Sequence, residues 1–233
     1  MRVFCSRPRQ QVVGRTWQSG AGSRYSAAGQ PRGRATRRRL TRRSIMSATA
    51  HPALLRQPFH TPADGPAVAA FAQRELQLLL AQDGSATRLC EVVAAGAVAL
   101  QLLDQQIVGR VPAEVGERLP GSRFIERITC LHAHGEVMMD NLSYIALDGL
   151  AADVRRELEE GVTPIGHLLA RMWVRRAFFD APPPALCERL WGVVGLPDAG
   201  ATRSYCITTP EGPCMLITET FRRGMRMAPA RQA

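Results

Sequence analysis

The chain has 233 residues, 45% of them hydrophobic, and no run of 18 apolar residues, so it fits one domain with a sizeable core and no membrane-spanning helix. Its formal net charge of +10 would suit a nucleic-acid partner, but twelve of the thirty basic residues, all arginine, fall in residues 1–46, where no acidic residue occurs. The remainder has eighteen arginines against twenty acidic residues, which argues against a nucleic-acid or membrane partner for the folded part.

The arginine-rich segment, residues 1–46, lacks hydrophobic periodicity and is rich in Gly and Ser, so we expect it to be disordered. We favour a translation start at Met46, because the segment contributes nothing that a fold needs. A transit-like segment and a polyanion-binding tail are the alternatives. The chain has no secretory signal and no C-x-x-C pair among its six cysteines, which predicts a cytoplasmic protein with reduced thiols.

Residues 47–63 contain several prolines and histidines and predict a linker, and residues 226–233 predict a disordered C-terminal tail. Between them, residues 64–225 predict one domain. Its first helix has Asp64 as the N-cap and Pro66 in the first turn. This helix carries an apolar stripe that consists of Val68, Phe71, Ala72, Leu76, Leu79 and Leu80.

A second helix is predicted from its N-cap Ser85 to Gly96. Apolar residues alternate in "AVALQLL", residues 97–103, which predicts a half-buried strand. Residues 105–122 are ambiguous, since Gly and Pro interrupt them at several positions.

Two hairpins follow. Residues 124–147 predict a long hairpin with its turn near His134-Gly135, and residues 203–221 predict another around a Pro-Glu-Gly turn. The segment between the hairpins predicts helices instead of strands. Strands joined by short turns, with helices before and between them, predict an α+β fold with a single antiparallel sheet and helices packed on one of its faces.

Three helices are predicted between the hairpins. The first is capped by Asp148 and ends at Gly161. The second starts with Thr163 as the cap and Pro164 at the first helical position, and it continues through "HLLARMWVRRAFF". The third covers residues 185–195.

Strand alternation places a carboxylate on an apolar face of the last hairpin, because Glu219 shares its face with Met215, Ile217 and Phe221. One interpretation is a structural carboxylate at a sheet edge or paired with an arginine. The other is a cavity carboxylate that accepts a hydrogen bond from a ligand hydroxyl. The pattern alone leaves both open.

Two arginines occupy similar positions. Arg127 shares a strand face with Ile125, Thr129 and Leu131, and Arg203 lies on an apolar face of its own strand. A planar guanidinium suits a bidentate contact with a substrate carboxylate, whereas a solvated or salt-bridged arginine is the alternative. His132 and His134 lack a third ligand in the sequence, so no metal site is expected.

Four stretches in order, "LLLAQDGSATRLCE", "ERITCLHAHGEVMMDNLSYIAL", "TPIGHLL" and "TRSYCITTPEGPCMLITETF", resemble the chorismate–pyruvate lyases. The resemblance covers roughly residues 75–222 and is closest to the bacterial and archaeal branch that makes 4-hydroxybenzoate. It implies one antiparallel sheet with a buried ligand cavity under helical flaps. It also implies elimination of pyruvate from chorismate, with no cofactor and no metal.

The resemblance also implies site residues. Arg127 would hold the ring carboxylate and Glu219 would meet the para oxygen. Backbone N–H groups at Ala86 and Ile165, on the two flaps, would touch the carboxylate, and Arg203 would be a further cavity arginine. The position of Ala86 often carries a larger apolar residue in that family, and the "DNLSYIAL" strand differs from the better-known bacterial enzymes.

Two other functions remain open at this point. The same architecture occurs in small-acid-sensing domains of transcription regulators, although residues 1–63 are too irregular to form a helix-turn-helix domain. A related lyase acting on another cyclohexadiene acid is the second. The sequence does not indicate the pathway that uses the product or the oligomeric state, nor whether Glu219 moves a proton or only positions the substrate.

Overall fold

The computed structural model of the protein describes residues 54–148 and 150–226. The N-terminal tail predicted over residues 1–46, residues 47–53 of the predicted linker and residues 227–233 lie outside this part of the chain. The linker prediction is wrong for the described residues 54–63, because Phe59 is buried in the core. The predicted domain is covered by the described residues almost throughout.

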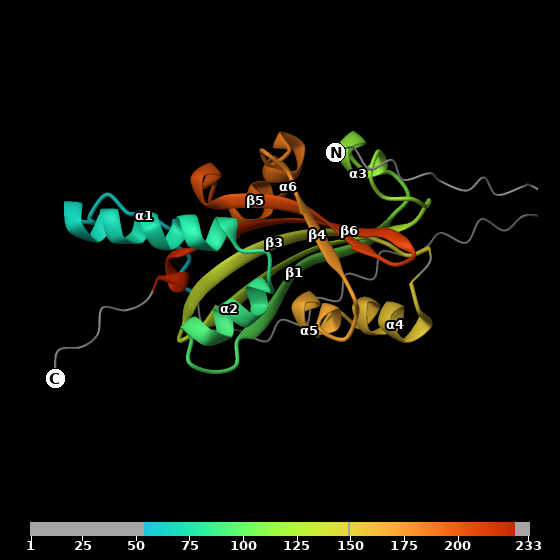
Figure 1. Ribbon diagram of the computed structural model, residues 1–233, viewed down its shortest axis with the longest axis horizontal. Helices are drawn as coiled ribbons and strands as arrows, with labels where there is room; N and C mark the ends of the chain where they lie inside the picture. The colour runs from blue at the N-terminus through green and yellow to red at the C-terminus, as the bar shows by residue number, and fades with distance from the viewer. Residues whose placement is uncertain (1–53, 149, 227–233) are drawn as a thin grey trace, which may run out of the picture. The chain divides into compact units, whose positions relative to one another are not determined.

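A six-stranded antiparallel sheet forms the centre of the fold, in the order β1-β2-β3-β6-β5-β4 (Figure 1). The α+β prediction is therefore confirmed. The two predicted hairpins, β2–β3 and β5–β6, lie side by side because β3 pairs with β6. The strands are β1 (Ala99–Val108), β2 (Phe124–Ala133), β3 (Glu136–Ala146), β4 (Arg175–Phe178), β5 (Thr202–Thr209) and β6 (Gly212–Phe221).

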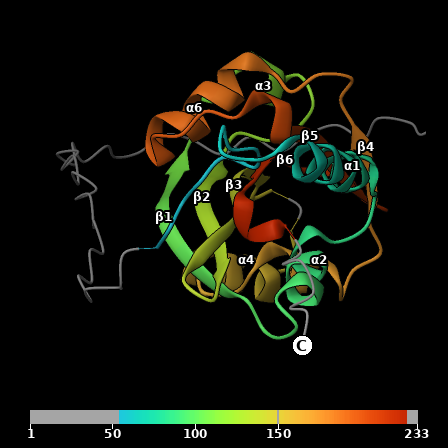
Figure 2. The ribbon, with the colours of Figure 1, turned by 90° about the vertical axis from the view of Figure 1, so that its left-hand side faces the viewer.

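Helices pack on both faces of the sheet, not on one face as predicted. Figure 2 shows α3 and α6 on one side of the strands and α2 and α4 on the other. The side chains of β3 are buried on both faces along nearly its whole length, so both faces of the sheet need a covering layer. The helices are α1 (Pro66–Ala81), α2 (Ala86–Val93), α3 (Ala113–Gly116), α4 (Ala152–Glu160), α5 (Ile165–Leu169) and α6 (Pro184–Val194).

The apolar core differs between the two faces. On the face that α3 and α6 cover, one cluster fills the interface, with Leu186 and Leu190 of α6 packed against Ile128 and Leu142. The other face has two clusters, one beneath α1 and α2 and one beneath α4 and α5. This division of the core leaves room for a site between the two clusters.

The first hairpin turns where the sequence predicts it. His134 and Gly135 have φ angles of 52° and 80°, which are the left-handed values that a two-residue type I′ turn requires. The turn sets the pairing of His132 with Val137. A bulge between Leu131 and His132 then shifts the register by one residue, so Arg127 lies opposite Ser143.

The predicted N-cap of α1 is wrong. Gly65 is the N-cap residue and makes no side-chain cap. The Asp64 carboxylate instead accepts the Thr61 N–H at 3.1 Å and pairs with Arg226 at 2.7 Å. A carboxylate with a cationic partner and a loop N–H has better contacts there than at the helix end.

The predicted caps of α4 and α5 are also wrong. Ala151 is the N-cap of α4, and the Asp148 carboxylate accepts the N–H of Ser122 instead. Pro164, not Thr163, is the N-cap of α5.

The helix predicted after Thr163 is much shorter than expected. α5 ends at Leu169, and the chain then forms β4, which pairs antiparallel with β5 at the edge of the sheet. Pairing with β5 satisfies backbone groups that a longer helix would have satisfied internally. The consequence is functional, because a strand points Arg175 and Arg176 to opposite faces.

The apolar stripe of α1 is buried only in its second half. Ala72, Leu76 and Leu79 join the core, whereas Val68 and Phe71 are 49% and 52% exposed. Figure 1 shows the first half of α1 extending beyond the end of the sheet, which explains the difference. In residues 54–148 and 150–226, no helix has both the length and the apolar character needed to cross a membrane.

The cysteines of the described residues are free and buried, as predicted for reduced thiols. Cys5 lies outside the described residues. Burial raises the pKa of the Cys130 thiol to about 11, so it is protonated at neutral pH and is not a poised nucleophile.

Candidate ligand-binding site

A cavity separates the two apolar clusters on the face covered by α2 and α5. It contains about 460 Å³ of empty space, part of it open to solvent. Both Arg127 and Glu219 line it, together with Ala86 and Ile165. The other lining residues are Ser85, Thr87, Leu100, Thr129, Leu131, Met139, Asn141, Pro164, Gly166, Leu169, Arg176, Tyr205 and Ile217.

Arg127 is a buried cation without an anionic partner in the described part of the chain. It is 1% exposed, and its Nη2 donates to the carbonyl oxygens of Gly161 and Thr163 at 2.8 and 3.1 Å. Its Nε and Nη1 are buried and find no hydrogen-bond partner among the described residues. Burial lowers the pKa of Arg127 to about 10, so the guanidinium still carries its charge at neutral pH.

The neighbours of Arg127 do not neutralise it. The residues opposite it in the sheet are Gln105 on β1 and Ser143 on β3, neither of which is charged. A buried cation with unpaired donors is costly unless a ligand supplies the missing acceptors. This arrangement therefore points to an anionic ligand, and a carboxylate matches the planar shape of the guanidinium.

Glu219 is also buried, but each of its two oxygens has a hydrogen-bond donor. Its Oε1 lies 2.6 Å from both Nε and Nη2 of Arg203, its neighbour across β5 and β6. Its Oε2 accepts the Tyr205 hydroxyl at 3.1 Å. Burial and the Glu219 charge raise the pKa of Tyr205 well above its usual value, so the phenol keeps the proton that it donates. The structure therefore shows Glu219 as a carboxylate that is paired with an arginine and that lines a cavity.

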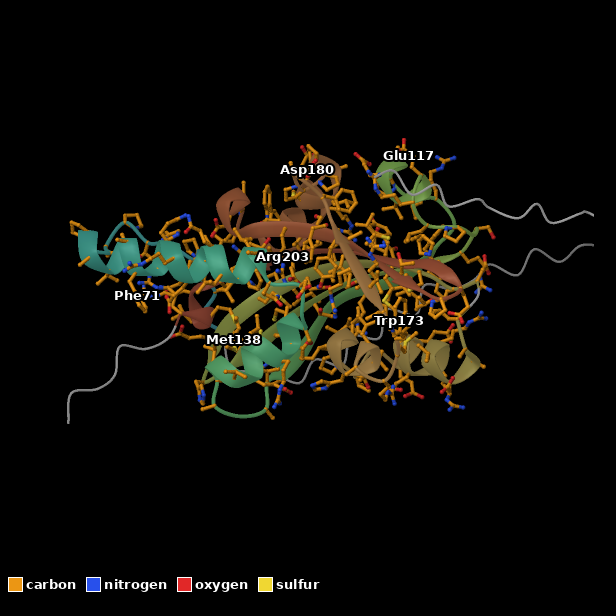
Figure 3. All side chains as sticks on the ribbon, in the orientation of Figure 1. Phe71, Glu117, Met138, Trp173, Asp180 and Arg203 are labelled. Carbon is orange, nitrogen blue, oxygen red and sulfur yellow. The ribbon has the colours of Figure 1, made fainter. Side chains whose placement is uncertain are left out.

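Arg203 lies behind Glu219, outside the cavity lining. Its Nη1 donates to the carbonyl oxygens of Leu79 and Gln82, both at 2.6 Å, where α1 ends. Figure 3 places Arg203 at the point where this end of α1 meets the sheet. A cation is well suited to the unpaired carbonyls of a helix C-terminus. The contacts of Arg203 are therefore with Glu219 and α1, and the structure gives it no surface in the cavity for the predicted substrate contact.

The N-termini of α2 and α5 meet above the cavity. Ser85 caps α2 as predicted, since its hydroxyl accepts the Arg88 N–H at 3.3 Å. The first N–H groups of both helices, which include those of Ala86 and Ile165, have no partner within their own helix. His167 of α5 lies 2.8 Å from the Glu91 carboxylate of α2, which links the two helices on the outer side.

Gly166 makes this close approach of the two helices possible. A Cβ atom there would lie 2.3 Å from Oγ1 and 2.7 Å from Cβ of Thr87, and 2.9 Å from Oγ of Ser85. Any side chain at this position would therefore push α5 away from α2, and with it the roof of the cavity.

We expect Gly166→Ala to weaken ligand binding, because the added methyl group strains the contact between α5 and α2. An added methyl group in a packed contact costs about 1–3 kcal/mol, which corresponds to roughly 5- to 150-fold in affinity if the strain falls on the closed form. Calorimetric titration with 4-hydroxybenzoate, the product that the family resemblance implies, measures this effect. Gly192→Ala in α6 is the matched control, because no atom lies within 4 Å of the added methyl. Equal affinities of the two variants for the ligand would show that the contact between α5 and α2 at Gly166 does not control binding.

One cation of the site was not predicted. Arg176 lines the cavity from β4, and its Nη1 donates to the Asp83 carbonyl oxygen at 3.2 Å. Its Nε is buried and has no hydrogen-bond partner among the described residues. Sequence reasoning missed Arg176 because the segment around it was interpreted as a helix. The stretch "RRAFF" does not alternate between polar and apolar residues, so it carries no clear strand signal.

The opposite face of the sheet shows how a purely structural charge is held in this protein. Glu126 accepts hydrogen bonds from Tyr144, Gln106 and Arg189, at 2.6 to 2.9 Å, and leaves no oxygen unpaired. Arg127, the next residue, differs because its Nε and Nη1 find no hydrogen-bond partner among the described residues. For residues 54–148 and 150–226, no group of three or more potential metal ligands is found.

Comparison with solved structures returns transcription-regulator domains at low similarity. The C-terminal domain of the histidine utilization repressor from Pseudomonas syringae pv. tomato has a TM-score of 0.39 and 9% identity, over 58% of this chain and 99% of that domain. PhnF from Mycobacterium smegmatis has a TM-score of 0.39 and 14% identity, over 69% of this chain and 81% of its own. These similarities are too low to bear on function.

No family model matches the chain. Among curated proteins, a chorismate pyruvate-lyase from Mycobacterium leprae is 27% identical over 162 residues, which covers 65% of this chain and 76% of the relative. The chain is therefore distantly similar to a chorismate pyruvate-lyase.

Proposed function

We propose that this protein is a chorismate lyase, which eliminates pyruvate from chorismate and releases 4-hydroxybenzoate. The observation that carries the proposal is the buried Arg127, whose unpaired N–H groups border a cavity that also contains Glu219. The distant similarity to the chorismate pyruvate-lyase of M. leprae supports the same reaction.

In the proposed complex, Arg127 binds the ring carboxylate, and the N–H groups of Ala86 and Ile165 complete its hydrogen bonds from above. Glu219 accepts the hydroxyl of the substrate at the other end of the ring. Apolar side chains of the lining pack against the ring faces; they include Leu100, Leu131, Met139 and Ile217. Arg203 is assigned as a positioning residue, since it holds Glu219 without lining the cavity.

The proposed reaction needs no nucleophile, because it produces an aromatic ring. The ether bond between the ring and the enolpyruvyl oxygen breaks, and the ring carbon that bears the hydroxyl loses its hydrogen as a proton. That proton ends on the methylene carbon of the departing enolpyruvyl group, which becomes the methyl group of pyruvate. The protein contributes by orienting the ring and stabilising the charge that develops.

Glu219 is assigned the role of an acceptor and not that of a base. Arg203 and Tyr205 already donate to its two oxygens, which fixes the orientation of the carboxylate. Such a carboxylate still has a free lone pair for the substrate hydroxyl. It therefore fixes the ring while the proton moves within the substrate.

The proposal is tested by incubating the purified full-length chain with chorismate. Formation of 4-hydroxybenzoate is followed by its absorbance, and pyruvate by coupling to lactate dehydrogenase. Stoichiometric release of both products supports the lyase. Chorismate binding without turnover supports the non-catalytic sensing module, and turnover of another cyclohexadiene acid alone supports the related lyase. An Arg127→Met preparation, purified in parallel, controls for a contaminating enzyme.

A further inference from the structure

The charges around the cavity do not balance. Its lining contains three groups that are charged at neutral pH, namely Arg127, Arg176 and Glu219. The Glu219 charge is offset by Arg203, which lies 2.6 Å away and outside the lining. No carboxylate of the described residues lies within 4 Å of either Arg127 or Arg176. The site therefore holds two positive charges without protein counterions.

The two arginines reach the cavity from different strands. Arg127 lies on β2, and Arg176 lies on the edge strand β4, where it is paired in register with Ile207 of β5. Each has at least one buried N–H group without a partner among the described residues, Nε and Nη1 in Arg127 and Nε in Arg176. Two separate sets of unpaired donors require two acceptors, which a single carboxylate on one of the arginines does not provide.

We infer that Arg176 binds a second carboxylate, so that the cavity is built for a dicarboxylate ligand. The inference rests on the proposed function, in which chorismate carries one carboxylate on the ring and one on the enolpyruvyl group. With Arg127 on the ring carboxylate, Arg176 is the remaining cation for the enolpyruvyl carboxylate. Neither product has two carboxylates, so Arg176 strengthens binding of the substrate relative to 4-hydroxybenzoate.

The chain offers a matched control for this assignment. Arg175 is the adjacent residue on β4 and is exposed, with its side chain on the opposite face of the strand. Arg175→Gln and Arg176→Gln therefore remove the same charge from neighbouring positions, and only Arg176→Gln removes it from the cavity. Arg176→Lys restores a positive charge and provides a second variant in case the glutamine variant does not fold.

The experiment compares two ligands across these variants of the full chain. Losing one charge-assisted contact should raise KM for chorismate about 10- to 100-fold in Arg176→Gln. The inhibition constant of 4-hydroxybenzoate should change less than about 3-fold, since no contact with it is lost. Arg175→Gln should alter neither, and Arg176→Lys should recover part of the loss.

Two results would overturn the assignment. An equal loss of affinity for both ligands would mean that Arg176 shapes the cavity or binds the ring carboxylate. Unchanged KM for chorismate would mean that Arg176 makes no contact with it. If the wild-type chain binds chorismate without converting it, the proposed reaction is wrong, and calorimetric affinities for the same two ligands then decide the role of Arg176 separately.

Discussion

Replacing Arg127 with methionine is expected to lower kcat/KM for chorismate by roughly a hundred- to several-thousand-fold. The change removes the cationic partner of a buried carboxylate, which costs about 3–5 kcal/mol, and each 1.4 kcal/mol is a factor of ten. Binding and turnover should fall together, because the ring carboxylate is held in the ground state and in the transition state. Steady-state kinetics on the purified variant measure the effect.

The stability of Arg127→Met should stay within about 2 kcal/mol of the wild type, a shift of less than about 8 °C in Tm. Two hydrogen bonds to Gly161 and Thr163 are lost, but a buried cation with unpaired donors is removed as well. Arg175→Met, on the exposed face of β4, is the control for charge. A folded Arg127→Met variant with normal kinetics would rule out this residue as the carboxylate site.

Replacing Arg203 with methionine should have its largest effect on stability. Glu219 would be left buried without a cation, and the carbonyl groups at the end of α1 would lose their donor. Breaking a buried pair in this way costs about 3–5 kcal/mol, and a chain of this length loses about 2–4 °C per kcal/mol. Thermal unfolding followed by circular dichroism should show Tm lowered by roughly 10 °C.

A double-mutant cycle separates the two partners of this pair. Glu219→Gln keeps an oxygen acceptor for Arg203, so it should be less destabilising than Arg203→Met but should lower turnover. The double variant Arg203→Met, Glu219→Gln should recover part of the lost stability, since no uncompensated carboxylate remains. Additive losses of stability would mean that the two side chains do not depend on each other, contrary to the 2.6 Å contact.

The sequence predicts those parts of the fold that depend on local patterns. Alternation and turn residues locate both hairpins, and they place Arg127 and Glu219 each on an apolar face of its own strand. The pairing of β3 with β6 brings these faces to one cavity. Both residues are recognisable because a charge interrupts an otherwise apolar face. Pairing of Glu219 with an arginine is one of the alternatives that the sequence leaves open, and the register of β5 against β6 identifies Arg203 as that partner.

Other features depend on contacts between distant segments and were not predicted. The sequence does not show that α3 and α6 cover the second face of the sheet, and β4 was interpreted as part of a helix. An edge strand of four residues is too short for a clear alternation signal and is defined by its pairing with β5. Because β4 was missed, Arg176 was missed as well.

The contact between α2 and α5 has a consequence for the kinetics of the protein. With Gly166 packed against Thr87, a ring-sized molecule that passes between the two helices requires them to separate. Each catalytic cycle would then include an opening event whose rate is independent of bond breaking. If the proposed elimination is faster than this opening, the measured turnover number would describe the movement of the helices and not the elimination itself.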